Sequence, residues 1–540
     1  MNHLVIAPLL LPLLAGIIHL FGRHLAYPWR RGFSFAVVLG QIGLALALLQ
    51  AVNDGSILTY ALGNWPAPFG IVMVADRLSV WMLLVTAVLA LFPLLYASRG
   101  IDVSGRHFHI LFQLQLFGLN GAFLTGDLFN LFVFFEVLLL ASYGLILHGG
   151  GSEKPQGGRL RTKAGLHYVV LNLVGSSLFL IAVGTLYGLF GTLNMADLAV
   201  KMAAVSPENL GPARTAGLLL FAVFALKAAL LPLYLWLPAA YAHTSAPVAA
   251  LFVIMTKVGA YSILRVSTLI FGAQTGDLIG PHASLPPGGT HPPWDGPAAG
   301  MSHLLDPWLL PLALATLMIG FLGALAARFL REQVAYLVVA SVGTLLTAFS
   351  LGNIAGLAAG LYYLPHSVFT GAVLFLLADR IALERGQGSG LVGDQFQPGP
   401  AVANPALLGG LFFVTAILAA GLPPLSGFVG KFLLLRAALD HPDATWIVAI
   451  VLIGGLLGLI ALARSGSLLF FHTLPRNKNA PPVASDLAAL LPAMLPILGL
   501  LALCLGLTLA AGPIYAYASA TAEQLLQPSL YVHAVLGGRP

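Results

Sequence analysis

The sequence predicts an all-α protein that crosses a membrane many times. Of the 540 residues, 59% are hydrophobic and only 8% are charged, whereas a soluble chain usually carries about 25% charged residues. The apolar residues gather into runs long enough to span a bilayer, which takes roughly 20 residues. The chain therefore has too little polar surface for a water-soluble fold, and its length allows about 14 transmembrane helices.

Apolar runs and short polar loops alternate along the whole chain. The runs lie at residues 4–21, 33–52, 78–97, 108–124, 128–147, 164–190, 214–236, 246–271, 307–327, 333–352, 355–379, 404–438, 446–470 and 489–511. The seventh contains Pro232 and is followed by Pro238, and the twelfth contains Pro423 and Pro424. Proline removes a backbone donor and clashes with the preceding turn, so we predict that helices 7 and 12 are broken.

The basic residues indicate how these runs are oriented. With the runs numbered in order, the odd-numbered loops and the run ends next to them carry 16 of the 25 Lys and Arg residues. The even-numbered loops, the run ends next to them and both termini together carry six. Cytoplasmic loops are enriched in Lys and Arg, so we expect both termini to lie outside the inner (plasma) membrane of a bacterial cell. This topology also accounts for the net charge of +6, and no nucleic-acid partner is expected.

Two stretches share the same order of runs and divide the chain. Residues 108–271 and 307–470 each contain five runs, the fourth of which is interrupted by proline. Because five is odd, the second stretch must be inverted relative to the first, as in many transporters. We predict an N-terminal three-helix segment (1–107), a first five-helix repeat (108–271), an external loop rich in Gly and Pro (272–306), a second, inverted five-helix repeat (307–470), and a C-terminal helix with a tail (471–540).

Lys227 and Glu136 are charged residues in otherwise apolar segments. Lys227 lies in VFALKAALLPLYLWLP, just before the predicted break, and Glu136 lies near the centre of DLFNLFVFFEVLLLASYGL. An ionised group at this depth is costly unless it is paired or hydrated. A snorkelling lysine and a structural ion pair are the alternatives to a transport role. A Glu136–Lys227 pair that opens would lower the proton affinity of the lysine, so we predict a proton switch.

Two further lysines lie on other helices. Lys257 lies in the eighth run, within ALFVIMTKVGAYSILR, and Lys431 follows the second break in GLPPLSGFVGKFLLL. Each could instead be held by helix carbonyls or a loop end, but three lysines on three helices favour a relay, since burial brings the pKa of lysine toward the working pH. His243 and His366 lie between the lysine-bearing segments, and histidine titrates near neutral pH; a satisfied structural histidine is the alternative reading of each.

Other polar residues in or near the runs have plainer explanations. Hydroxyls such as those of Ser341, Thr344 and Ser426 could hold water, but hydroxyls in membrane helices commonly form hydrogen bonds that pack the helices together. Acidic residues at span ends, namely Asp76, Asp127 and Asp379, are expected at a solvated edge, and Asp127 is the best candidate among them for a wider role.

Catalytic and cofactor chemistry is poorly supported. The chain has one cysteine, Cys504, which excludes cysteine-ligated iron–sulfur clusters and internal disulfides. It has no glycine-rich phosphate loop after a strand, no zinc-type spacing of histidines and cysteines, and no serine-nucleophile elbow. We therefore expect no catalytic residues, no cofactor and no metal site.

Three segments resemble a known family when taken in order. GDLFNLFVFFEVLLLASYGL, LKAALLPLYLWLPAAYAHTSAPVAALFVIMTKVGAYSILR and GLPPLSGFVGKFLLL resemble the antiporter-like subunits shared by respiratory complex I and the multisubunit (Mrp-type) cation/proton antiporters. The resemblance is strongest to the D subunits of the Mrp type. It covers nearly the whole chain and is densest between residues 108 and 440.

The resemblance implies 14 helices, two inverted five-helix repeats, and breaks in helices 7 and 12. It also implies roles for the residues that match the motifs. Glu136 would be the acid paired with Lys227, Lys257 the central connector and Lys431 the terminal proton carrier, while His243 and His366 would be polar links along the midplane. The family often has a lysine four residues after the histidine of helix 11. Here that position is Thr370, so the link would rest on His366 and water.

These observations favour a proton-translocating subunit of a multisubunit sodium (or other monovalent cation)/proton antiporter. Its partners would be other subunits of a hetero-oligomeric membrane complex, protons, monovalent cations and the lipid bilayer, and it would not be an enzyme. The alternative is a proton-pumping membrane subunit of respiratory complex I (NADH:quinone oxidoreductase) or of a related membrane hydrogenase. A stand-alone secondary carrier is a third possibility. Neighbouring genes would separate the first two, because only the second needs iron–sulfur or flavin subunits.

Overall fold

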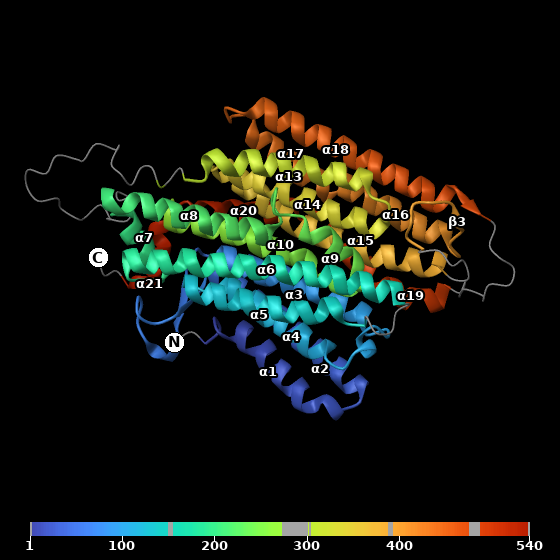
Figure 1. Ribbon diagram of the computed structural model, residues 1–540, viewed down its shortest axis with the longest axis horizontal. Coiled ribbons are helices and arrows are strands. Elements are labelled where there is room, and N and C mark those ends of the chain that lie inside the picture. Colours follow the sequence, from blue (N-terminus) through green and yellow to red (C-terminus); the bar gives the residue numbers. More distant parts are fainter. Residues whose placement is uncertain are drawn as a thin grey trace, which may run out of the picture.

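The helices of the computed structural model run roughly parallel along the long axis of the molecule (Figure 1). The structure describes residues 3–149, 155–272, 301, 304–386, 393–474 and 487–537. Within these ranges, 11 helices are long and apolar enough to cross a membrane, and three shorter apolar helices accompany them. The chain is therefore a multi-pass α-helical membrane protein, as predicted, while the total of 14 spans stays a prediction. Most of the predicted external loop, 272–306, lies outside the described residues.

In the first half of the chain, the described residues form ten α-helices and one hairpin. In order these are α1 (Ala7–Phe21), α2 (Tyr27–Val52), β1 (Leu58–Ala61), β2 (Val72–Ala75), α3 (Arg77–Ala97), α4 (Phe108–Leu124), α5 (Leu128–Leu147), α6 (Pro155–Phe190), α7 (Met195–Ala203), α8 (Pro207–Ala228), α9 (Trp236–His243) and α10 (Ala246–Val266). Strands β1 and β2 pair antiparallel, and short 3₁₀ turns follow α1, β1 and α3 at Gly22–His24, Leu62–Asn64 and Asp102–Ser104. A π-helical turn, Ser267–Phe271, continues α10.

The second half repeats part of this order. Its elements are α13 (Asp306–Ala326), α14 (Leu330–Ser350), α15 (Ile354–Gly386), β3 (Gly399–Pro400), α16 (Pro405–Ala420), α17 (Ser426–Ala438), α18 (Ala444–Gly466), β4 (Thr473–Leu474), α19 (Leu487–Leu509), α20 (Ala511–Leu525) and α21 (Pro528–Leu536). A second π-helical turn, Ser467–Phe471, follows α18. Strands β3 and β4 form a short parallel pair. The start of α1 and helix α21 lie at the same end of the bundle (Figure 1).

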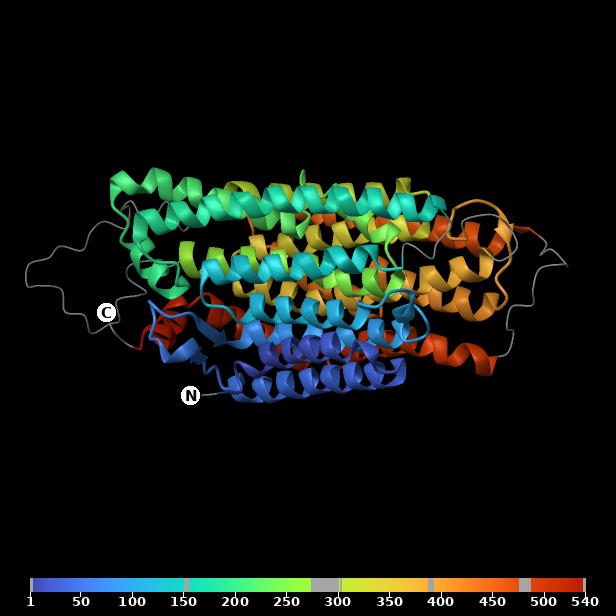
Figure 2. The same cartoon turned by 60° about the horizontal axis from the view of Figure 1, so that its bottom comes forward.

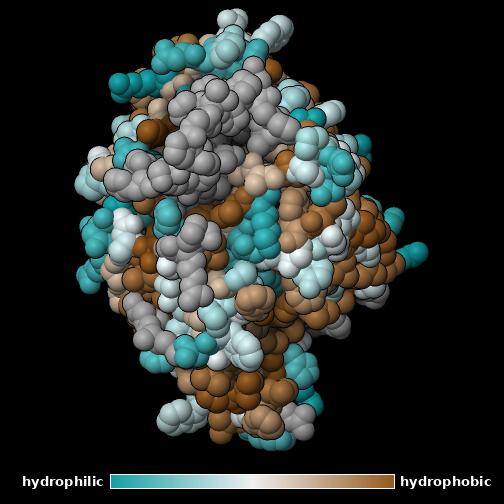
Figure 3. Space-filling model, turned by 90° about the vertical axis from the view of Figure 1, so that its left-hand side faces the viewer, coloured by the Kyte–Doolittle hydropathy of each residue, from teal (hydrophilic) through white to brown (hydrophobic). Residues whose placement is uncertain are grey.

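The burial pattern is that of a protein surrounded by lipid. Helices α10 and α15 are buried along their whole apolar windows and lie in the middle of the bundle in both ribbon views (Figure 2). Outer helices such as α1, α6 and α18 expose leucine, isoleucine and valine side chains. Seen from the end that carries the termini, hydrophilic residues are scattered over the end face, and hydrophobic residues dominate the lower edge (Figure 3). Apolar surface that faces hydrocarbon needs no cover, so these exposed side chains are expected.

Acidic and amide side chains begin several helices. Asp76 accepts a hydrogen bond from the backbone of Ser79 and so caps α3, Asp127 caps α5, and Asn194 caps α7. Each side-chain oxygen satisfies a backbone N–H that has no partner within the first turn. The position of Asp76 and Asp127 at span ends, predicted from the sequence, therefore has a structural cause.

The chain is interrupted where the prolines suggested, with one difference. Helix α8 ends at Ala228, and Pro232 lies in the irregular segment before α9. The segment between α16 and α17 contains Pro423 and Pro424. Pro238, in contrast, lies in the first turn of α9, where the missing backbone N–H would have had no helical partner. The second interruption is at Thr244 instead, whose backbone is extended between α9 and α10.

Close packing between α8 and α10 depends on Gly259. A Cβ atom at this position would lie 2.3 Å from the backbone nitrogen of Ala228, next to Lys227. We expect Gly259→Ala to push the two helices apart and to lower the stability of the purified protein by about 1–3 kcal/mol. Thermal unfolding in detergent measures this effect. Gly184→Ala on α6 is the control, because a Cβ there meets nothing within 4 Å; equal melting of the two variants would refute the expectation.

Candidate proton path

Lys227 is buried at the end of α8 and is held by a neutral partner. Its Nζ atom donates a hydrogen bond to Oδ1 of Asn172 on α6, at 3.2 Å. The same ammonium group lies 5.9 Å from the centre of the Phe135 ring, a distance at which a cation is attracted to the ring face. The lysine is therefore placed inside the bundle by an amide and an aromatic ring.

Glu136 lies on α5 and is partly buried. Its carboxylate accepts a hydrogen bond from the hydroxyl of Ser176 on α6, and this hydroxyl also approaches the carbonyl oxygen of Asn172, at 3.0 Å. Residues 172 and 176 are one turn apart, so they share one face of α6. A polar turn of α6 therefore separates Glu136 from Lys227.

The direct Glu136–Lys227 ion pair predicted from the sequence is absent among the ion pairs of the described residues. Asn172 and Ser176 take the place of the direct contact, and sequence reasoning missed both. Their spacing of four residues in the apolar run LHYVVLNLVGSSLFL was the available signal. The structure thus shows the two charges apart, with hydrogen-bonding groups between them.

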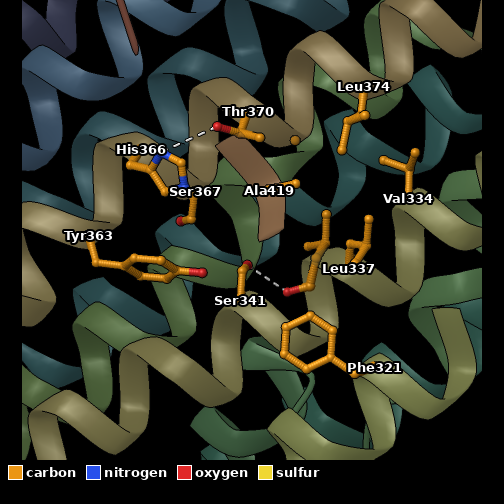
Figure 4. Close-up of a pocket in the computed structure, with 12 residues that line it drawn as sticks. Phe321, Val334, Leu337, Ser341, Tyr363, His366, Ser367, Thr370, Leu374 and Ala419 are labelled. Atoms are coloured by element: carbon orange, nitrogen blue, oxygen red, sulfur yellow. Dashed lines mark hydrogen bonds between the residues drawn. The ribbon is translucent and has the colours of Figure 1, made fainter. Parts of the chain in front are cut away.

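Lys257 is completely buried on α10. Its Nζ atom donates a hydrogen bond to Oγ of Ser341 on α14, at 2.8 Å. Ser341 also lines a cavity of about 30 Å³ together with Tyr363, His366, Ser367 and Thr370. The rest of the lining is mostly apolar, and a space of this size has room for one or two water molecules beside these polar groups. Figure 4 shows the hydroxyl of Tyr363 directed toward Ser341, with His366 and Thr370 on the far side of the same space.

His366 connects this cavity to the second helix break. Its Nδ1 atom is 3.0 Å from Oγ of Ser426, the first residue of α17, and 3.4 Å from Oγ1 of Thr370. The hydroxyl of Thr370 also lies 3.7 Å from Sγ of Cys504. A hydroxyl can pass on a hydrogen bond but carries no charge, so His366 is the titratable group of this stretch.

Lys431 is buried on α17, immediately after the break. Its Nζ atom donates a hydrogen bond to the carbonyl oxygen of Ala420, at 2.8 Å, and lies 5.5 Å from the centre of the Phe321 ring. Ala420 is the last residue of α16, and the last carbonyls of a helix have no partner within it. The broken helix thus supplies the acceptor that holds this lysine.

The backbone of His243 does not lie beside Lys227, although the resemblance implied a midplane link. Its backbone carbonyl accepts a hydrogen bond from Arg161 of α6 at 2.9 Å, whereas Lys227 contacts Asn172 of the same helix. Eleven residues separate these two contacts, which is about 16 Å along a helix. Helix α9 therefore carries the chain away from the break, so that His243 lies near the basic end of α6.

Arg265 and Asp76, unlike the three lysines, form a buried ion pair. Arg265 on α10 contacts Asp76 through two nitrogen–oxygen distances of 2.7 Å, and its guanidinium lies over the rings of Tyr261 and Tyr531. Burial alone would raise the pKa of Asp76, but the charge and hydrogen bonds of Arg265 outweigh it and lower that pKa. Both groups stay ionised, which is typical of a structural pair.

The described site thus contains three buried lysines with uncharged acceptors. The acceptors are Asn172 Oδ1, Ser341 Oγ and the Ala420 carbonyl. A neutral oxygen stabilises an ammonium group far less than a carboxylate does, so a proton can leave at a smaller cost. No group of three or more His, Cys, Asp or Glu side chains suited to a metal occurs in the part of the chain that the structure describes.

Known proteins resemble this chain along its whole length. A family model described as "NADH:quinone oxidoreductase/Mrp antiporter, TM" matches residues 125–279 and 297–458. The D subunit of a probable K(+)/H(+) antiporter from Rhizobium meliloti is 39% identical, with 99% of this chain and 98% of the relative aligned. The D subunit of the Na(+)/H(+) antiporter from Alkalihalophilus pseudofirmus is 36% identical over 99% and 100% of the two chains. A chain from the solved Mrp complex of Dietzia sp. superposes with a TM-score of 0.82 at 28% identity, with 99% of this chain and 100% of that chain covered.

Proposed function

We infer a transport function from the fact that this chain belongs to the NADH:quinone oxidoreductase/Mrp antiporter family of membrane subunits. It is the proton-translocating subunit of a multisubunit monovalent cation/proton antiporter, and it acts beside other subunits of a hetero-oligomeric complex. The names of the relatives that align over their full length support this choice, and they include both sodium and potassium. The chain is a transporter subunit and not an enzyme, and it lies in the bacterial inner membrane with both termini outside.

The proton path runs from Glu136 through Lys227 and Lys257 to His366 and Lys431. The observation that carries this proposal is that each buried lysine contacts an uncharged oxygen. A charge kept only for structure is expected to have a counter-charge, because desolvation of an unpaired ion is costly. The polar turn of α6, with Asn172, connects the first two charges. His243 provides a polar group near one end of the path.

The two repeats are part of this proposal. In each unit the first two helices pack through glycines, since Cβ atoms at Gly121 and Gly320 would overlap residues of the neighbouring helix. The third helix of each repeat, α6 or α15, is its longest. The fourth helix is interrupted, between α8 and α9 or between α16 and α17, and the fifth, α10 or α18, ends in a π-helical turn. These parallels support the division into residues 108–271 and 307–470, inverted relative to each other.

Dye-monitored exchange in membrane vesicles tests the proposal. Vesicles that carry the complete set of antiporter subunits are energised with a proton gradient, and sodium or potassium is then added. We expect the cation to collapse the gradient when this chain is present and to have no effect when it is omitted. Cation-dependent collapse of equal rate in the absence of this chain would refute the function. Proton uptake driven by a quinone-linked electron donor, and not by the cation, would favour a respiratory complex.

A further inference from the structure

A second group of buried ionisable residues lies outside the lysine path, where α1, α2 and α4 meet. It consists of His19 on α1, Ser34 on α2, His109 on α4 and Asp102 in the turn before α4. All four are buried. Nε2 of His19 lies 2.8 Å from Oγ of Ser34, the same Oγ lies 2.9 Å from Nδ1 of His109, and Nε2 of His109 lies 3.3 Å from Oδ2 of Asp102. The four groups therefore form one continuous hydrogen-bonded chain.

The hydrogen-bonded chain begins at the partly exposed side chain of Arg31 and leads inward. Asp102 also accepts two hydrogen bonds from Arg31, at 2.6 and 2.7 Å, and the side chain of Arg31 is 29% exposed. Burial would raise the pKa of Asp102, but hydrogen bonds from His109 and Arg31 outweigh it and lower the pKa to about 2. Asp102 is therefore a fixed negative charge at neutral pH, and it lies in contact with the ring of His109.

The neighbouring charges are few and of known position. Arg30 of α2 is buried and donates to the carbonyl of Arg106, at 2.8 Å. His148, at the end of α5, binds the carbonyl of Ile101, and its own carbonyl accepts from Arg161. Together with Arg31 and Asp102, these are the charged or titratable groups whose contacts around the two histidines the described residues show. None of the path lysines takes part in these contacts.

The polar surface continues one turn deeper. Gln113 follows His109 by four residues, so both lie on the same face of α4, and a Cβ at Gly16 of α1 would touch it. The amide of Gln113 is buried and has no hydrogen-bond partner within the described ranges. A buried amide without a partner is costly, so this position calls for a hydrogen-bonding species between α1 and α4.

We propose that Asp102, His109, Ser34 and His19 form a proton relay that leads inward to a proton-binding site on His19, beside Gln113. Asp102 accepts the Nε2 proton of His109, so a second proton on this ring is held at Nδ1 and passes to Oγ of Ser34, while the original Ser34 proton passes to Nε2 of His19. Two N–H or O–H bonds break and two form, and the net result is one proton moved from His109 to His19.

Whether a proton occupies the His19 site sets how cation/proton exchange depends on pH. This part of the inference rests on the proposed function. Infrared difference spectra of the purified complex, taken between pH 8 and pH 3 with isotope-labelled histidine, test the relay without any transport. The variants His19→Gln and His109→Gln assign the two ring signals. We expect Ser34→Ala to move the titration of the His19 ring by about one pH unit, because its partner hydroxyl is gone.

Ser465→Ala is the matched control, because Ser465 is also a buried serine but its hydroxyl bonds only to the carbonyl of Leu462. It should leave both ring titrations unchanged. In vesicles, the pH profile of exchange should shift by a similar amount in Ser34→Ala and not in Ser465→Ala. Identical ring titrations in Ser34→Ala and the unmodified protein would overturn the relay, whatever the exchange assay shows. Absence of exchange in the unmodified protein would instead count against the proposed function alone.

Discussion

Replacement of Lys227 by alanine is expected to reduce cation/proton exchange by at least about a hundredfold while the protein stays in the membrane complex. A positioned proton-transfer group contributes about 10²–10⁴ to a rate, and the ammonium of Lys227 is the group that faces Asn172 and, through α6, Glu136. Exchange in energised vesicles measures the loss, and affinity purification of the complex measures assembly.

Lys201→Ala provides the control for a lysine outside the bundle. The side chain of Lys201 is 42% exposed and pairs with Asp197 one turn earlier on α7, so we expect exchange within about twofold, because exposed pairs contribute little. Normal exchange by assembled Lys227→Ala would remove this residue from the path.

The variant Asn172→Asp tests the surroundings of Lys227 in a second way. It places a carboxylate where the structure has a neutral oxygen 3.2 Å from the Lys227 ammonium. An opposite charge at this distance favours the protonated lysine, so proton release should slow, and the exchange rate should fall although both groups can still bind protons. An unchanged rate would mean that the neutrality of residue 172 has no role.

Much of the fold could be predicted because a bilayer imposes a simple rule on the sequence. Backbone groups in hydrocarbon must be satisfied within helices, so apolar runs of the sequence predict helices, and the breaks fall next to Pro232 and Pro423. The lysines were also visible, because a charge inside an apolar run stands out from its neighbours. What the sequence does not show is which groups face each other across helices.

The features of the site that could not be predicted from the sequence have local causes. Asn172 and Ser176 escaped notice because amides and hydroxyls are common in membrane helices, and only the packing of α6 between α5 and α8 shows their role. The position of His243 relative to Lys227 could not be predicted, because the length of the irregular segment before α9 cannot be read from hydropathy. The relay at His19 was missed because its members are far apart in the sequence and lie near span ends, where polar residues are usual.

The effect of removing Arg265 should be structural, in contrast to the buried lysines. Arg265→Met leaves Asp76 as a buried carboxylate without its counter-charge, and loss of one partner of a buried pair costs about 3–5 kcal/mol. We expect a lower melting temperature of the purified protein in detergent and weaker assembly. The double variant Asp76→Asn/Arg265→Met should recover most of the lost stability, because no uncompensated charge remains and Asn can still cap α3.

The pH dependence of stability offers an independent check on this pair. Because the pKa of Asp76 is lower in the folded protein, its stabilising effect is present above the ordinary carboxyl pKa of about 4 and is lost as the pH falls below it. The melting temperature of the unmodified protein should therefore fall in this acidic range more steeply than that of the double variant. Parallel curves, or an Arg265→Met variant as stable as the unmodified protein, would contradict a structural role. Buried lysines with neutral partners lack this carboxylate, and their replacement should spare stability while it removes transport.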